Sequence, residues 1–362
     1  MVPVSCVSTA PVPPPAYQRA VAKRGPVLHI DALTLVTRLH LLTLCGLAVH
    51  QAPRRCQPPL PKGPGGAPRR YSDASLLLIA LLRTLWRLSP RAMADWLRAW
   101  PALAVACGLP ARPDGTPWVP SPSQQWKRAA QTGAPPCETL FVLVVKEAIR
   151  RRVIGARDLI IDSAPIKAWR RADPDALYGH APAHHPTAFL RGYRVHTLLC
   201  RGSGLPVFFR LAPANGHDAP FATPLLATAV ALYALHALRP RVVRLDAAYW
   251  GLTLIEWIHT TLGTVAVIPF NAKATKDLSC LPPTWTKDEL GKRSSIERFF
   301  GRVLLFFRLQ RPPLSGWSAV TCRVALTYTA VIVVALIAHD AGRPDLIRSP
   351  ARVLAHCWEG LL

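Results

Sequence analysis

Apolar and polar residues follow one another along the chain with two different periods, and the period changes near residue 150. Before that point, apolar residues recur three or four positions apart, which is the spacing of helices with one buried face. The pattern predicts helices over 29–50, 71–88, 90–100, 120–130 and 139–152. Ser89 and Pro90 separate the second helix from the third, because a serine followed by a proline favours a cap and a first helical turn.

Beyond residue 150, the chain has short runs rich in Val, Ile and Leu that are typical of strands. These runs predict strands at 158–162, 193–200, 206–211, 241–246 and 264–269, and helices at about 219–237, 293–309 and 324–338. Asp218 is the expected N-cap of the first of these helices, with Pro220 in its first turn, in preference to a catalytic role. Strands interleaved with helices indicate the α/β class with a mixed sheet.

The apolar segment 324–338 has no charged residue, but its 15 residues are fewer than the roughly 20 that cross a bilayer. A buried core helix is the favoured interpretation. Nine cysteines are scattered without a CxxC pair, and no signal peptide is recognised. These features favour a reducing, cytoplasmic location.

The chain is strongly basic. It has 44 Lys and Arg against 20 Asp and Glu, a formal charge of +24, while half of its residues are apolar. A folded protein with this charge is expected to bind a polyanion, with nucleic acid favoured over an anionic membrane. The short helices within 71–130 fit either a helix-turn-helix-like DNA-binding module or an ordinary helical subdomain.

Acidic residues are scarce, so their positions are informative. Asp162 follows the apolar run LII, Asp246 ends the run RVVRLD, and Glu297 lies in a predicted helix among arginines. A carboxylate beside an apolar strand is costly to desolvate unless it is paired or holds a metal ion. Because strand-end carboxylates on neighbouring strands converge at one sheet edge, these three acids are the candidate site.

Two aspartates and one glutamate suit hard divalent cations. Mg²⁺ takes oxygen ligands and is completed by substrate phosphate. Two such ions activate the attacking oxygen and stabilise the leaving oxygen in an in-line phosphoryl displacement. The surrounding Arg and Lys would then hold a DNA backbone.

Four stretches give the sequence a family resemblance: LIIDSAPIKA, GYRVHTLLCRGSGLPVFFRLAPANGHDA, RLDAAYWG and RSSIERFFGRV. In this order and spacing they resemble a bacterial insertion-sequence transposase with a DDE catalytic domain of ribonuclease H-like fold. The resemblance implies that Asp162, Asp246 and Glu297 are the catalytic and metal-binding triad. It implies cleavage at transposon ends and joining of 3′ ends to target DNA, with Mg²⁺ or Mn²⁺ as cofactor, two ions per active site.

The resemblance also implies partners and a domain plan. The expected partners are double-stranded DNA, as terminal inverted repeats and target, and a second copy of the chain on DNA, with no membrane. The expected location is the bacterial nucleoid. The predicted regions are a proline-rich, basic, largely flexible segment, a helical DNA-binding region, a DDE catalytic domain and a C-terminal tail, over 1–70, 71–150, 151–345 and 346–362.

The sequence departs from the family pattern at two positions. Leu290 stands where many relatives have a tyrosine before Arg293, and Leu304 stands where they often have a lysine or arginine after the glutamate. Arg302 and Arg308 are the candidates to replace the missing cation. The triad itself is intact.

Several further residues are candidate DNA contacts. Tyr249 and Trp250 would stack on an unpaired base, although packing at the sheet edge is the favoured alternative. Phosphate contacts are expected from basic residues, namely Lys167, Lys273, Lys276, Arg293, Arg298, Arg302 and Arg308. The cluster of His180, His184 and His185 is interpreted as a solvated loop rather than a zinc site.

Two other functions stay open beside a transposase. One is a DNA-binding relic or repressor that occupies transposon ends without cutting them, against which the intact acids argue. The other is a host nuclease on the same fold. Short inverted repeats flanking the gene would favour a mobile element.

The charge of +24 predicts a steep salt dependence of DNA binding, because neutralising phosphates releases counterions. The affinity for a duplex with a transposon end should fall by orders of magnitude between roughly 50 and 200 mM salt. Fluorescence anisotropy across a salt series measures this slope. An affinity that does not change over this range would contradict extensive phosphate contact.

Overall fold

The computed structural model describes residues 28, 30–53, 70–181, 187–271 and 287–354. The chain divides into two compact units. We call Met1–Leu143 with Ala325–Leu362 the helical unit, and Val144–Val324 the sheet unit. The functional boundaries predicted at residues 70, 150 and 345 stay predictions.

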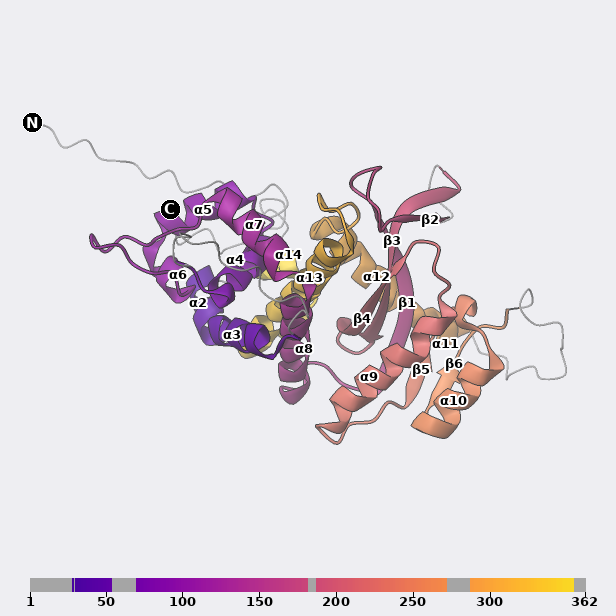
Figure 1. The fold of residues 1–362 in the computed structure, drawn as a ribbon. Helices are drawn as coiled ribbons and strands as arrows, with labels where there is room; N and C mark the ends of the chain where they lie inside the picture. Colours follow the sequence, from indigo (N-terminus) through magenta and orange to yellow (C-terminus); the bar gives the residue numbers. More distant parts are fainter. Residues whose placement is uncertain (1–27, 29, 54–69, 182–186, 272–286, 355–362) are drawn as a thin grey trace, which may run out of the picture. The chain divides into compact units, whose positions relative to one another are not determined.

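The described part of the helical unit consists of helices joined by short turns (Figure 1). It contains α2 (Ala32–Arg38), α3 (Leu41–Gln51), α4 (Asp73–Trp86), α5 (Pro90–Ala99), α6 (Pro101–Ala106), α7 (Pro122–Thr132), η5 (Pro344–Leu346) and α14 (Pro350–Val353). Two helices, α8 (Ala134–Arg150) and α13 (Trp317–Asp340), continue from one unit into the other. The single helix predicted over 29–50 is wrong, because His40 takes a left-handed conformation with φ of 48° and divides it into α2 and α3.

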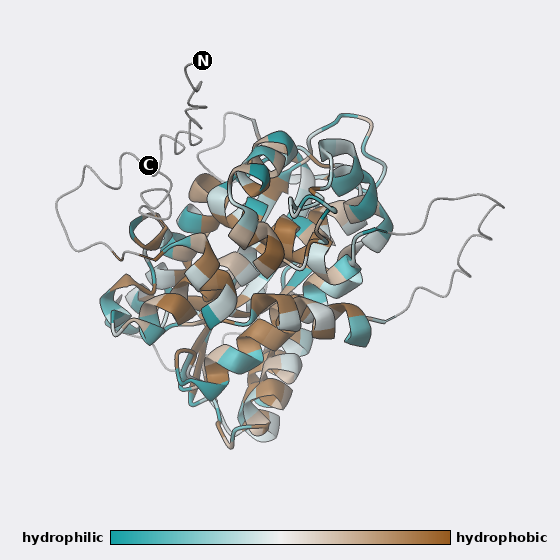
Figure 2. Cartoon of the chain, turned by 90° about the vertical axis from the view of Figure 1, so that its left-hand side faces the viewer, coloured by the Kyte–Doolittle hydropathy of each residue, from teal (hydrophilic) through white to brown (hydrophobic). Residues whose placement is uncertain are grey.

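Side-chain caps fix the starts of several helices that the sequence predicted. The Ser89 side chain accepts a hydrogen bond from the Ala92 N–H and begins α5, as predicted. Ser121 and Gln124 form a reciprocal capping box at the start of α7. Many helices mix hydrophobic and hydrophilic residues (Figure 2), as expected when one helix face is buried. The buried rings of Trp86 and Trp96 meet edge to face, with centroids 5.1 Å apart, in the core of this unit.

The sheet unit is built on a mixed sheet, which confirms the predicted α/β class. Its strands are β1 (Asp158–Lys167), β2 (Leu177–His180), β3 (Phe189–Cys200), β4 (Leu205–Pro213), β5 (Val242–Arg244) and β6 (Val265–Val267). Their order is β2-β3-β1-β5-β6, and β4 pairs with β3. Strand β3 is antiparallel to β1, β2 and β4, whereas β5 is parallel to β1 and β6.

Helices flank this sheet (Figure 1). They are η1 (Ala219–Phe221), α9 (Ala222–Ala234), η2 (Ala247–Tyr249), α10 (Leu252–Leu262), α11 (Lys287–Gly291), η3 (Lys292–Ser294), α12 (Ser295–Gly301) and the π-helix η4 (Arg302–Phe306). Helix α9 packs on β3 and β4, and α12 packs on β1. The sheet is therefore packed by α9, from the middle of the chain, and by α12, from its last third.

Two local predictions for this unit are wrong. Strand β1 does not end at Asp162 but continues to Lys167, because β3 supplies pairing partners as far as Gly192. Asp218 does not cap a helix: its backbone is helical, with φ of −75° and ψ of −40°, and its side chain makes no capping hydrogen bond. An N-cap residue needs an extended backbone to aim its side chain at the first turn.

One helix in the described part of the chain, α13, is long and apolar enough to cross a bilayer. In the structure, 89% of its most apolar 18-residue stretch is buried inside the protein, as predicted for a core helix. Helices α2 and α3 are long and apolar enough to cross a bilayer only if they are counted together, and their axes are bent by 55° relative to each other.

Gly192 is a tight point between β1 and β3. A Cβ atom at this position would lie 2.1 Å from the carbonyl oxygen of Ile166. Gly192→Ala should therefore separate the two strands and lower the free energy of unfolding by roughly 2 kcal/mol or more. Gly202→Ala is the matched control, because its nearest heavy atom is Cys200 Sγ at 3.9 Å. Denaturant unfolding of both variants measures the difference, and equal stability would contradict the tight packing.

Candidate active site

Strand pairing places Asp162 and Asp246 side by side. The last parallel pair between β1 and β5 joins Ile160 to Arg244. Each aspartate lies two residues beyond its member of this pair, one on β1 and the other where the chain leaves β5. The register therefore carries the two carboxylates to the same level of the sheet, although they are far apart in sequence.

One cation contacts both carboxylates. The Arg293 Nη1 atom lies 3.3 Å from Asp162 Oδ2 and 3.4 Å from Asp246 Oδ1. The remaining Oδ1 atom of Asp162 accepts the Ser163 N–H at 2.7 Å. Because a single nitrogen reaches both side chains, the two carboxylates point toward a common position.

The backbone holds each aspartate in place. Asp246 has an extended backbone and accepts the Ala247 N–H at 2.7 Å, so it caps η2 directly after β5. Asp162 sits in the middle of β1, where it is paired with Thr197 of β3. Neither carboxylate therefore depends on a long loop for its position.

Ion pairs attach the segment that contains Arg293 to the sheet. Arg244 on β5 is buried and pairs with Asp158 of β1 at 3.4 Å and with Glu289 of α11 at 2.9 Å. Glu289 also pairs with Lys292, the residue before Arg293. These contacts connect β1, β5 and α11 directly to η3, which explains why Arg293 reaches the aspartates.

Burial raises the pKa of the Asp162 carboxyl group. Desolvation is the largest cause that raises the pKa of its carboxyl from 3.8 to about 6, with further raising by the negative charges of Asp246 and Asp218. The Ser163 N–H and the Arg293 guanidinium act in the opposite direction. The folded chain therefore has a costly negative charge at this point at neutral pH.

Glu297 occupies a different place. It is exposed on the first turn of α12, four residues after Arg293, so the two side chains are one helical turn apart. Among the described residues, no group of three or more His, Cys, Asp or Glu side chains is close enough to hold a metal ion. The structure thus brings together Asp162 and Asp246, with Arg293 between them, and leaves Glu297 at the solvent.

The predicted aromatic contacts are in the interior. Tyr249 is 1% exposed and Trp250 is 8% exposed, and the Trp250 ring contacts Phe270 at 5.2 Å between centroids. This burial favours the packing alternative for both rings. Tyr249 also lies next to the aspartates, since its N–H bonds to the Asp246 carbonyl oxygen.

The predicted phosphate contacts differ in exposure. Lys167, Arg298 and Arg308 are exposed, and Arg298 donates to the Ser294 hydroxyl. Arg302 donates to the Gly204 carbonyl oxygen at 2.8 Å and is tied to the turn between β3 and β4. Leu304 is half-buried in the π-helix.

Of the predicted histidine cluster, His180 alone lies in the described part of the chain. His180 is exposed on β2 and contacts the Phe189 ring. His184, His185, Lys273 and Lys276 lie outside the described residues.

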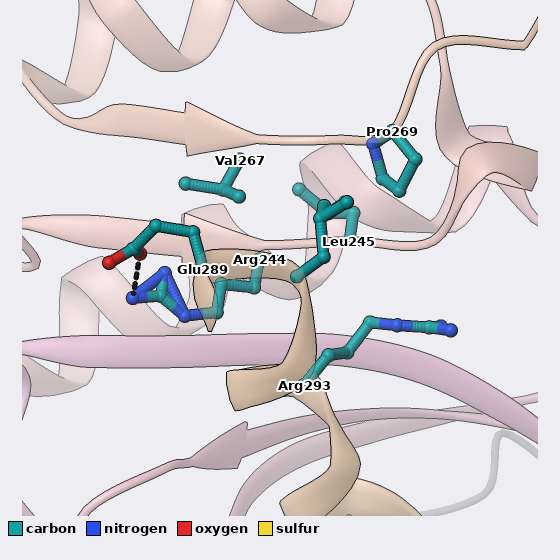
Figure 3. Close-up of a pocket in the computed structure, with 7 residues that line it drawn as sticks. Arg244, Leu245, Val267, Pro269, Glu289 and Arg293 are labelled. Carbon is teal, nitrogen blue, oxygen red and sulfur yellow. Dashed lines mark hydrogen bonds and ion pairs between the residues drawn. The ribbon is translucent and has the colours of Figure 1, made fainter. Parts of the chain in front are cut away.

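A small pocket is lined in part by Arg293, the residue that contacts both aspartates (Figure 3). Its lining includes Arg244, Glu289 and Arg293, together with apolar Leu245, Val267, Pro269 and Leu290. Leu290, which stands in place of the tyrosine of many relatives, therefore contributes an apolar wall next to Arg293. The hydrogen bond between Arg244 and Glu289 closes one side of the pocket.

A buried polar group next to the site was missed by the sequence analysis. His196 on β3 is fully buried, with Nδ1 3.4 Å from both Asp218 Oδ1 and Tyr249 Oη. Arg194 lies 3.7 Å from Asp218 and donates to the Ser163 hydroxyl at 3.1 Å. Burial lowers the pKa of His196 to about 3, with the Arg194 charge adding to the effect, so the imidazole is neutral.

This group connects the neighbours of both aspartates, because Ser163 follows Asp162 and Tyr249 belongs to the turn that Asp246 caps. The sequence signal was the polar pair Arg194 and His196 inside an apolar strand. Its meaning depended on where Asp218 lies.

Carboxylates side by side at neighbouring strands of a mixed sheet are typical of enzymes that transfer phosphoryl groups with divalent cations. The family model described as "Transposase DDE domain" matches residues 154–333, about half of the chain and nearly all of the sheet unit. The chain belongs to this transposase family. It is a DNA transposase, a class of polynucleotidyl transferases that depends on divalent metal ions.

Some solved structures resemble this chain, with low sequence identities and low TM-scores. The piggyBac transposase synaptic complex with hairpin DNA has a TM-score of 0.44 and 8% identity, covering 91% of this chain and 80% of that chain. The Mos1 mariner paired end complex with Mn has a TM-score of 0.31 and 13% identity, covering 83% and 80%. The Mos1 strand transfer complex has a TM-score of 0.30 and 14% identity, covering 97% of both chains. No curated protein matches the chain.

The raised pKa of Asp162 predicts a stabilising substitution in metal-free protein. The native state binds the Asp162 proton more tightly than the unfolded chain, so stability is lost as pH rises from 3.8 toward 6. Asp162→Asn removes this loss and should raise the free energy of unfolding at pH 8 by up to roughly 3 kcal/mol. Below pH 3.8 the gain should vanish. Thermal unfolding in EDTA at the two pH values measures both effects.

Asp158→Asn is the matched control on the same strand. Its carboxylate pairs with Arg201 and with buried Arg244, so its removal should lower stability at pH 8. If Asp162→Asn is destabilising at pH 8 in EDTA, the charge at position 162 is not the costly one.

Proposed function

We propose that Asp162, Asp246 and Glu297 are the catalytic acids of this transposase, and that they cleave DNA at transposon ends and join the 3′ ends to target DNA. The observation that supports this most strongly is the contact of one Arg293 nitrogen with both aspartates. Two carboxylates that converge on a cation within a basic protein form a cation site by charge and by geometry. The gene that encodes this chain is proposed to belong to a bacterial insertion sequence.

The residues present fit divalent metal ions. Asp162 and Asp246 offer hard oxygen donors, which Mg²⁺ and Mn²⁺ prefer, and their convergence already compensates a positive charge. Asp162 and Asp246 would hold the metal, and Glu297 would add the third carboxylate. Two bound ions would activate the attacking oxygen and stabilise the leaving oxygen of the phosphodiester.

Arg293 and Glu297 have linked roles in this proposal. Both lie on the helical segment that packs on β1, one turn apart. Arg293 compensates the two aspartates in this structure, and its guanidinium would be available to a DNA phosphate if bound metal ions supplied that compensation. Glu297 is exposed one helical turn after Arg293, and we assign it the third carboxylate of the acid set.

DNA is held by the basic surface around the acids. Lys167 at the end of β1, Arg298 on α12 and Arg308 after the π-helix are exposed, and we assign them to the phosphate backbone. The helical region 71–150 supplies recognition of the terminal inverted repeats. A homodimer on DNA pairs the two transposon ends.

The proposal predicts that the amide variants Asp162→Asn, Asp246→Asn and Glu297→Gln each lose cleavage and strand transfer. The amide keeps the size of the side chain but removes the charge that binds the metal ion, so activity should fall by at least about a thousandfold. Affinity for transposon ends should stay within a few fold of wild type. Gel assays of end cleavage and strand transfer with Mg²⁺, beside binding in EDTA, measure these quantities.

Glu256→Gln is the matched control for Glu297→Gln, because Glu256 is also an exposed glutamate on a helix of the sheet unit. It should retain wild-type activity. A correctly folded triad variant that cuts ends at near wild-type rate would remove that residue from the catalytic set.

A further inference from the structure

The outer face of β2 and of the start of β3 is aromatic. Tyr178 pairs with Arg191, and His180 pairs with Phe189, in the antiparallel register of these strands. Directly opposed residues project from the same face of a sheet, so these four side chains share one face. Tyr178 is 67% exposed and Phe189 is 57% exposed, which is unusual for aromatic rings.

The opposite face of this strand pair is closed at Gly179 and Leu190, whereas Leu177 at its end is 43% exposed. Gly179 is buried, and a Cβ there would lie 1.9 Å from the Ala214 carbonyl oxygen. Leu190, its partner on β3, is also buried. The strand pair therefore packs against the protein through one face. Because side chains alternate along a strand, its aromatic residues lie on the other face.

Arginine is built into the aromatic face. The Arg191 guanidinium lies 5.8 Å from the centre of the Tyr178 ring, and it donates to the carbonyl oxygens of Ala176 and Asp173 at 3.0 and 2.7 Å. Carbonyl oxygens fix the side chain in position without neutralising its charge. The His180 and Phe189 rings contact each other, with centroids 5.1 Å apart.

A second pair of an aromatic ring and an arginine lies next to this face. Arg311 stacks over the Trp169 ring at 5.0 Å and donates to the Trp169 carbonyl oxygen at 3.2 Å. The residue before Trp169, Ala168, donates its N–H to the Arg191 carbonyl oxygen. Trp169 is 44% exposed. Strand β1, which contains Asp162, leads directly into this region.

We propose that Tyr178, Phe189 and Trp169, with Arg191 and Arg311, form a binding surface for unpaired bases of DNA. Exposed rings stack on bases of any sequence, and the fixed arginines attract the adjoining phosphates. Bases inside a duplex have no free face for such stacking, so the ligand is a single-stranded end or overhang. The proposal rests on the function proposed above, since strand cleavage is the step that exposes unpaired bases.

Charge favours nucleic acid over a protein partner. The chain has a formal charge of +24, and the two arginines on this surface donate to backbone carbonyl oxygens. The Tyr249 and Trp250 rings, which the sequence suggested for stacking, are buried. In the described part of the sheet unit, exposed rings paired with arginines are found on this surface instead.

Binding of two DNA probes to the full chain in EDTA tests the proposal. One probe is a blunt duplex, and the other has the same duplex with a short single-stranded overhang that contains 2-aminopurine. Wild-type protein should bind the overhang probe more tightly and quench the 2-aminopurine. The variant Tyr178→Ala/Phe189→Ala should lose the quenching and about tenfold or more in affinity for the overhang probe, with unchanged affinity for the blunt duplex.

Two further variants keep the test decisive. Tyr178→Phe retains the ring and should behave as wild type, and Leu235→Ala removes another exposed apolar side chain, 64% exposed, without effect. Equal losses on both probes, or no loss on either, would overturn the proposal. So would a changed oligomeric state of DNA-free protein with unchanged DNA binding, which would assign the surface to a protein contact. If the double variant unfolds, Trp169→Ala and Arg191→Gln report on the same surface.

The binding test needs no catalysis, so its outcome is separate from that of the triad variants. Inactive wild-type protein that still prefers the overhang would refute the catalytic proposal alone. Active protein without this preference would refute the base-binding surface alone.

Discussion

The site depends on compensating two negative charges placed side by side at the edge of a buried sheet. Asp162 and Asp246 reach the same level because β1 and β5 are parallel and in register, and the Arg293 guanidinium contacts both. Without a cation the two carboxylates would repel each other, and burial adds to that cost by raising the pKa of Asp162. Arg293 thus supplies the positive charge that compensates both carboxylates.

Much of the surrounding structure serves this placement. The ion pairs of Arg244 with Asp158 and Glu289 fasten β1 and β5 to α11, and α11 leads into the turn that contains Arg293. On the other side, His196 and Asp218 connect the neighbours of the two aspartates through buried polar contacts. The positions of the two aspartates are therefore set by strand pairing and by buried polar groups.

The aromatic residues of the sheet unit divide into two sets with different uses. Tyr249 and Trp250 follow Asp246 closely in sequence but pack in the interior. Tyr178 and Phe189 are far from any acid motif in sequence, yet they are exposed because β2 adds a short strand to the edge of the sheet and buries only its glycine side. Sequence proximity to the acids therefore gave no guide to which rings face solvent.

The amino-acid sequence by itself determined the classes of element and the chemistry. Apolar periodicity located most helices and strands, Ser89 marked a helix start, and scarce acids in a basic chain indicated a cation site. These patterns arise from interactions between residues close in sequence, so they can be recognised without knowledge of the fold. The tertiary structure decided what depends on distant partners: β1 continues past Asp162 because β3 pairs with it, and Asp218 faces His196 instead of capping a helix. Strand register brought Asp162, Asp246 and Arg293 together, because only pairing across the sheet fixes which residues become neighbours.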